Sequence, residues 1–228
     1  MESGNIEHQV LAQRLLQQTS IDDPFTGKVA PAEVQARSKL WPDASRWEKL
    51  TLKYVIEQGP RRIEEYVFTG VPGYALTEMG VDLPVAIVFE QQGDGRSIAR
   101  LYSAHELVNG RGPMLPVDES IVPTRGADDI FVDYFHALHE ADMEATVATF
   151  AEDGYMRHSN GKAYIGHDAL RGAFTKFFAN GPIKLRYCNK TDADGITALE
   201  CYMPSGRPAC AIYHRSADNK VYAARLYL

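Results

Sequence analysis

Two segments of this chain repeat each other without gaps, and this repeat is the feature that most restricts the fold. Residues 85–103 read VAIVFEQQGDGRSIARLYS and residues 210–228 read CAIYHRSADNKVYAARLYL. The two segments share AI near the start and ARLY near the end, with turn residues in register between them. Self-similarity of this kind predicts two copies of one supersecondary unit, each ending in a β-hairpin.

The second half of the chain shows the clearer order of elements. Apolar residues at helical spacing mark three segments between residues 128 and 177, interrupted by a strand-like GYMRHS and an NGK turn. Asp142 is a predicted N-cap of the second helix. Four β-rich runs follow, separated by the turn signals DADG, PSGR and ADNK: IKLRYCN, ITALECYM, ACAIYHR and VYAARLYL. This order predicts an α+β domain in which helices cover one face of a curved antiparallel sheet.

The first half parallels the second in a shorter form. FTGKVAPAEVQARSKLWPDA parallels SNGKAYIGHDALRGAFTKFFANG, and LTLKYVIEQ parallels IKLRYCNKT. One helix is expected at 7–18 where the other copy has two, and VPGYALTEMGVD is an insertion. Residues 109–126 are rich in Gly and Pro without helical or strand period, which indicates a linker. We therefore predict domains at 1–108 and 127–228.

Composition narrows the functional classes. The 228 residues suffice for two domains, and 45% apolar and 24% charged residues are typical of globular proteins. A net charge of −6 without a basic stripe argues against nucleic-acid binding, and the lack of a long apolar run or a signal-like N-terminus argues against membrane association or export. Three cysteines without a CxxC pair predict reduced thiols, half-buried in strands, so we expect a cytoplasmic protein.

Residues 127–228 resemble the NTF2-like superfamily, specifically its SnoaL-like and ketosteroid-isomerase-like members. The resemblance lies in YFHALHEADMEATVATFAEDGYMRHSNGKAYIGHDALRGAF, which places a tyrosine before a D-x-E-A helix, a strand ending in histidine, and a G-x-x-A-L helix. It implies a cystatin-like cone, in which the sheet wraps around a pocket that helices close on the concave side. Since the opposite sheet face usually dimerises in this family, two copies imply an internal pseudo-dimer with its sheets back to back. Further association between chains stays open.

The resemblance also implies roles for particular residues. Tyr134 matches the family's oxyanion-donating tyrosine, and His158 stands where ketosteroid isomerases carry an aspartate base. Ala211 stands where the family has a second, acidic donor. A histidine with an unperturbed pKa of about 6.5 can accept and return a proton near neutral pH. A solvent-facing strand end for His158 and an ordinary core position for Tyr134 stay open. We expect four residues to shape the substrate pocket: Tyr155, Met156, Ala211 and Tyr213.

Two further sets of residues are weaker candidates. Asp23, in SIDDPFTGK, resembles the base-bearing strand end of ketosteroid isomerases and is a candidate second-copy base, although a turn-forming DDP is the interpretation that we favour. The first copy is then mainly a structural partner. His136 and His139 lack the HExxH pattern of a zinc site and are expected on the solvent side of their helix. We therefore expect no metal and no cofactor.

The implied function is a small-molecule isomerase, cyclase or dehydratase of the SnoaL-like type. General acid–base proton transfer would act on an apolar, carbonyl-containing compound of polyketide-like or terpenoid-like character. The alanine at position 211 argues against steroid isomerisation itself. Two alternatives remain open at this point. One is a binding protein that holds a ligand in the same cone without turnover, and the other is an assembly domain whose cone is filled by Phe135, Phe150 and Phe174.

Overall fold

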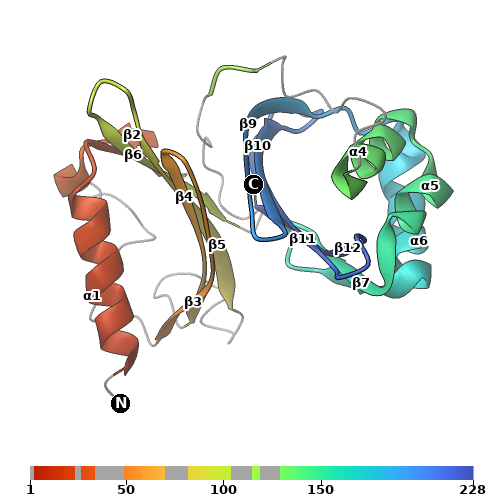
Figure 1. Ribbon diagram of the computed structural model, residues 1–228, viewed down its shortest axis with the longest axis horizontal. Coiled ribbons are helices and arrows are strands. Elements are labelled where there is room, and N and C mark those ends of the chain that lie inside the picture. Colours follow the sequence, from red (N-terminus) through yellow and green to blue (C-terminus); the bar gives the residue numbers. More distant parts are fainter. Residues whose placement is uncertain are drawn as a thin grey trace. The chain divides into compact units, whose positions relative to one another are not determined.

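The computed structural model describes residues 3–23, 27–33, 49–69, 82–103, 115–118 and 129–227. The chain divides into two compact units, Met1–Met114 with Tyr227–Leu228, and Leu115–Leu226. Each unit is built on one six-stranded sheet with helices, which confirms the predicted α+β class (Figure 1). The predicted boundaries near 108 and 127 lie outside the described residues. They stay predictions, as does the packing of the two units as a pseudo-dimer.

In the part of the first unit that the structure describes, the chain forms one long helix and a sheet of order β2-β1-β6-β5-β4-β3. Its elements are α1 (Ser3–Leu16), β1 (Ser20–Asp23), β2 (Gly27–Val29), β3 (Lys49–Gln58), β4 (Arg61–Thr69), β5 (Leu83–Gln91) and β6 (Ser97–Ser103). The helix predicted at 7–18 is therefore present, but it begins and ends earlier. It lies along one face of the sheet (Figure 1), where Leu11 and Leu15 join a buried cluster of apolar strand residues. Nearly all of the insertion lies outside the described residues.

The described residues of the second unit form three α-helices and a sheet of order β8-β7-β12-β11-β10-β9. Its elements are α4 (Ile130–Glu140), α5 (Met143–Ala148), β7 (Phe150–Arg157), β8 (Ala163–Ile165), α6 (Gly166–Phe177), η3 (Phe178–Asn180), β9 (Arg186–Ala193), β10 (Ile196–Tyr202), β11 (Pro208–Arg215) and β12 (Val221–Tyr227). The sheet curves around α4, α5 and α6, which lie on its concave side (Figure 1). All the predicted helices and strands of this half are present.

The two sheets have the same strand order and differ from the expectation in the same way. Strands β3 to β6 and β9 to β12 form the antiparallel meanders. β1 pairs with β6 in parallel and β7 pairs with β12 in parallel, so each sheet is mixed rather than antiparallel throughout. A parallel pair needs a long crossover connection, and here the rest of the unit forms that crossover. The origin of the two units by duplication stays a prediction.

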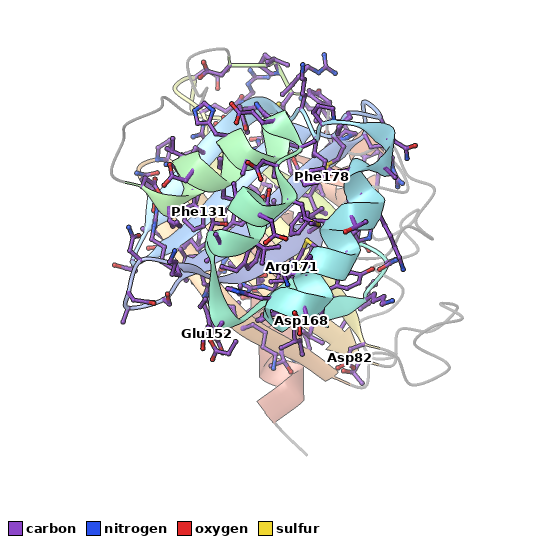
Figure 2. The ribbon with its side chains drawn as sticks, turned by 90° about the vertical axis from the view of Figure 1, so that its right-hand side faces the viewer. Asp82, Phe131, Glu152, Asp168, Arg171 and Phe178 are labelled. Carbon is purple, nitrogen blue, oxygen red and sulfur yellow. The ribbon has the colours of Figure 1, made fainter. Side chains whose placement is uncertain are left out.

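Side-chain caps explain where two helices of the second unit, α4 and α5, begin. Asp129 caps α4 by accepting a hydrogen bond from the Phe131 N–H at 3.0 Å, and Asp142 caps α5 by accepting from the Ala145 N–H at 2.9 Å, as predicted. Arg171 on α6 donates to both carboxylate oxygens of Glu144 on α5, at 2.8 and 3.1 Å. Figure 2 shows Arg171 one turn beyond Asp168, which also accepts from it.

A partly buried charge network ties the start of α4 to the sheet. The Arg215 guanidinium lies 3.1 Å from Asp192 and 3.2 Å from Asp129, and its carbon lies 4.3 Å from the centre of the Phe131 ring. Lys190 lies near the same two carboxylates. Burial disfavours the charged form of Asp192, but hydrogen bonding and charge from Arg215 outweigh it and hold the Asp192 pKa below its usual range. The network therefore ties Asp129, the N-cap of α4, to β9 and β11.

Replacing Arg215 with methionine is expected to lower the free energy of unfolding by about 1–3 kcal/mol at neutral pH, because it leaves Asp192 without its main partner. The lowered Asp192 pKa means that this stabilisation is complete above the ordinary aspartate pKa of about 3.9 and is lost as pH falls through the folded-state value. Urea unfolding should therefore show that the difference in the free energy of unfolding between the original protein and Arg215→Met becomes smaller as the pH is lowered. A difference that becomes larger at low pH would contradict the stabilising role of the Arg215–Asp192 contact.

The three thiols lie in strands, as predicted, but they are buried rather than half-buried. Cys188 lies in β9, Cys201 in β10 and Cys210 in β11, and all three are free. Burial of Cys201 raises its pKa, with a further contribution from Cys188. No helix in the described part of the chain is long and apolar enough to cross a membrane.

Candidate functional site

A cavity of about 280 Å³ lies in the second unit, enclosed by α4, α6 and the strands of the sheet. It brings together five of the six residues that the sequence nominated in this half of the chain: Tyr134, Met156, His158, Ala211 and Tyr213. These residues come from α4, from β7 and the position after it, and from β11. Met156 shares its face of β7 with the following His158 by strand alternation, as Ala211 and Tyr213 share theirs on β11.

Tyr155 is the exception and does not line the cavity. Strand alternation turns it to the other face of β7 from Met156. There its hydroxyl accepts a hydrogen bond from the Arg225 guanidinium at 3.2 Å, and its ring meets the edge of Tyr222. The structure thus places Tyr155 on the far side of the sheet from the predicted pocket, so its substrate-binding role is not supported by its position.

Tyr134 is held rigidly at the wall of the cavity and is only 2% exposed. Its ring packs against Phe135, Phe150 and Tyr213, with centroids 5.5 to 5.6 Å apart. The structure shows no hydrogen-bond partner for its hydroxyl among the described residues. Burial raises the pKa of Tyr134, so the hydroxyl keeps its proton and can donate it in a hydrogen bond.

His158 follows the last residue of β7 and is positioned by its own turn. Its backbone N–H donates to the Lys162 carbonyl at 2.9 Å, and its ring stacks on Phe177 with centroids 5.2 Å apart. The Asn160 N–H and the Ser159 hydroxyl each lie 3.4 Å from Nδ1. Within the described structure Nε2 has no protein partner, so it is the ring nitrogen available to a ligand.

The stacking partner of His158 was not among the predicted site residues. Phe177 lies on the apolar stripe of α6, where the sequence pattern indicates only a core position. Its contact with His158 joins a helix to a strand end nineteen positions earlier in the chain, and no local pattern reports such a contact. Lys176, Asn180 and Met203 also line the cavity and were not among the predicted site residues.

Asp23 in the first unit takes the topological place of His158. Ile21 pairs with Ala99 across the parallel pair of the first sheet, as Met156 pairs with Ala224 in the second. The two alanines open the two ARLY segments, so the residue two positions after Ile21 corresponds to the residue two positions after Met156. The Asp23 side chain lies outside the described part of the structure, and its role as a base stays a prediction.

His136 and His139 are half-buried, and the expectation that both face solvent is wrong. The chain before β9 folds back over this side of α4, where His139 Nε2 lies 3.3 Å from both the Leu185 N–H and the Tyr187 hydroxyl. Burial lowers the His139 pKa, and the nearby His136 and Lys184 lower it further. No group of three His, Cys, Asp or Glu side chains suited to hold a metal occurs in the described ranges.

Comparison with known families gives one match. Residues 131–221 match the model of a family described as a SnoaL-like domain, and this range runs from the second residue of α4 to the first residue of β12. The chain thus contains a SnoaL-like domain in its second unit, as the resemblance indicated. The search of curated proteins finds no match.

Solved structures resemble the chain over less than half its length. A SnoaL-like protein of unknown function from Burkholderia thailandensis is 15% identical over 42% of this chain and 88% of its own, with a TM-score of 0.38. A protein of ketosteroid isomerase-like fold from Catenulispora acidiphila, in complex with trimethylamine, is 16% identical over 44% and 85%, with a TM-score of 0.39. The epoxide hydrolase/cyclase-like enzyme SalBIII, of pyran ring formation in the polyether salinomycin, is 18% identical over 43% and 88%, with a TM-score of 0.37.

Proposed function

We propose, from the SnoaL-like domain at residues 131–221, that this protein catalyses proton transfer on an apolar small molecule that carries a carbonyl group. The reaction class is an isomerisation, a cyclisation or a dehydration by general acid–base catalysis. One observation carries the proposal. The same cavity is lined by His158 and by Tyr134, whose hydroxyl has no partner in the described structure. Both groups suit the removal of a proton next to a carbonyl.

The proposed mechanism gives each group one task. Nε2 of His158, which has no protein partner in the described structure, takes a proton from the carbon beside the carbonyl. The electron pair of the broken C–H bond moves toward the carbonyl oxygen, where the Tyr134 hydroxyl donates a hydrogen bond to the developing enolate. The imidazolium then returns its proton to another carbon or to a departing hydroxyl group. Apolar lining residues such as Leu226 and Met156 exclude water and strengthen the hydrogen bond from Tyr134.

A second candidate function is ligand binding without turnover. Ala211 favours it, because this residue lines the cavity where the ketosteroid-isomerase pattern has an acidic donor. Tyr213, two positions further on the same strand face, is a second buried hydroxyl at the cavity, and burial raises its pKa. The assembly alternative has less support. Phe174 lines the cavity, and Phe150 packs against the rings of Phe174 and Tyr134. These two side chains therefore leave the cavity unfilled.

The proposal is tested with 2-tetralone, an apolar bicyclic ketone with acidic protons beside its carbonyl. We expect the protein to accelerate deuterium exchange at these positions in D₂O, followed by ¹H NMR. Replacing Tyr134 with phenylalanine should lower the rate about a hundredfold, the usual cost of one lost oxyanion donor. The melting temperature should stay the same or rise slightly, because the substitution removes a buried hydroxyl that makes no hydrogen bond to the described part of the protein.

Tyr155→Phe is the matched control, because this hydroxyl lies on the other face of β7. Its exchange rate should equal that of the original protein. Binding of 2-tetralone without faster exchange would favour the ligand-binding alternative. An unchanged rate in Tyr134→Phe would remove Tyr134 from the mechanism.

A further inference from the structure

The charge on the cavity wall is unbalanced. Most lining residues are apolar, the polar ones at depth carry hydroxyl, thiol and imidazole groups, and none of the described lining residues is Asp or Glu. Lys176 is the one lining residue with a permanent charge. An apolar cavity with a single cation selects ligands by charge as well as by shape.

Lys176 lies at the mouth of this cavity. Tyr134 and Ala211 are almost fully buried and form its depth, whereas Lys176 in the last turn of α6 and Asn180 in η3 are exposed. The structure shows no ion pair or hydrogen bond of the Lys176 ammonium with any described residue. Lys190 by contrast lies within ion-pair distance of two aspartates. The Lys176 charge is therefore available to a ligand that enters the cavity.

We propose that the substrate is an amphipathic anion: an apolar ring system with a carboxylate that Lys176 binds at the mouth of the cavity. This inference rests on the proposed function, because the carbonyl group is then the end that reaches Tyr134 and His158. A carboxylate at the mouth keeps much of its hydration, so its binding avoids the cost of burying a charge. The apolar rings fill the space between Phe174, Leu138 and Met156. Lys176 is thus a specificity-determining residue.

Two probes of equal ring size separate charge from shape: 2-naphthoate and its neutral methyl ester. Isothermal titration calorimetry at low ionic strength should give 2-naphthoate an affinity about threefold to fivefold higher than that of the ester, the range expected for a solvent-exposed ion pair. In Lys176→Met the two affinities should become equal, and in Lys176→Arg the preference should persist. Added salt should reduce the preference of the original protein for 2-naphthoate over the ester, and it should leave the ratio of the two affinities unchanged in Lys176→Met.

Lys184→Met is the matched control. Lys184 lies between Ile183 and Leu185, which line the cavity, but does not line it itself. Its replacement should keep the preference for 2-naphthoate. If Lys176 only stabilises the C-terminal end of α6, Lys176→Met should have a lower melting temperature but the same ratio of affinities for 2-naphthoate and its ester. That result would overturn the proposal.

The outcomes separate this inference from the proposed function. If the original protein bound 2-naphthoate and its ester with equal affinity, the proposal of an anionic substrate would be overturned. The cavity would still be a binding site for apolar compounds. Failure of both probes and of 2-tetralone to bind would overturn the cavity site, and with it both proposals. A preference for the acid that Lys176→Met abolishes, with Lys184→Met unchanged, would support the inference.

Discussion

Replacing His158 with alanine should lower the α-proton exchange rate of 2-tetralone by about a thousandfold, within the usual range for loss of a general base. The remaining cavity still binds the ketone, and Tyr134 still faces its oxygen, but no group is left to take the proton. The melting temperature should shift by no more than about 2 °C, because the half-buried side chain makes only long polar contacts, at 3.4 Å, within its own turn and one stacking contact with Phe177. The measurements are ¹H NMR exchange and thermal unfolding by circular dichroism.

Two controls make this result specific. His167→Ala removes an imidazole whose Nε2 lies 3.0 Å from the Phe150 carbonyl and which does not line the cavity, so its exchange rate should not change. Added imidazole should restore part of the rate in His158→Ala, since it can occupy the space beside Phe177. Full activity of His158→Ala without imidazole would refute the proposed role of His158.

Replacing Gly154 with alanine should be the most damaging small change to the fold of the second unit. A Cβ atom at this position would lie 2.7 Å from the Val221 carbonyl oxygen and 2.9 Å from the Ala151 carbonyl oxygen. Both contacts are with backbone, so β7 and β12 would have to move apart. We expect a loss of about 3 kcal/mol in the free energy of unfolding, measured by urea denaturation.

The position of Gly154 explains why the site would suffer as well. The pairing of β7 with β12 shifts between Val221, which faces Phe150, and Ala223, which faces Tyr155. This irregularity, with Gly154 at its closest approach, decides that Met156 faces the cavity and that His158 follows it there. We therefore expect Gly154→Ala to lower the exchange rate even under conditions in which the variant stays folded.

Gly172→Ala is the matched control for this substitution. Gly172 lies on the exposed side of α6, where an added Cβ meets nothing within 4 Å. Alanine there should raise the free energy of unfolding by about 0.5–1 kcal/mol, because glycine is a poor helix former. Equal stability of Gly154→Ala and the original protein would show that the two strands can separate at this point without cost.

The sequence alone was sufficient for the features that depend on residues close together in the chain. The helical period placed Tyr134, Phe135 and Leu138 on the buried face of α4, and the capping role of Asp142 followed from its residue type. Strand alternation put Ala211 and Tyr213 on one face, and both line the cavity. These predictions hold because a period of 3.6 or 2 is a local property of the backbone.

Contacts between segments distant in the chain decided the rest. The half-burial of His139 was missed because the chain before β9 covers that side of α4, and a single helical pattern contains no information about a segment 46 residues later. Tyr155 was expected at the pocket, but strand alternation turns it to the face of β7 opposite Met156, and the pairing of β7 with β12 decides which of the two faces meets the cavity. The same pairing brings His158 into the cavity with Tyr134.

The chain by itself thus determined the two related sheets, the helices that cover the second one, and the residue types available for proton transfer. Only the tertiary structure decided which of those residues meet in one cavity, that Phe177 stacks on His158, and that Lys176 stands at the mouth. The physical reason is the difference in range. Periodicity and capping act within a few residues, whereas a cavity is formed by packing between elements that the sequence separates by tens of positions.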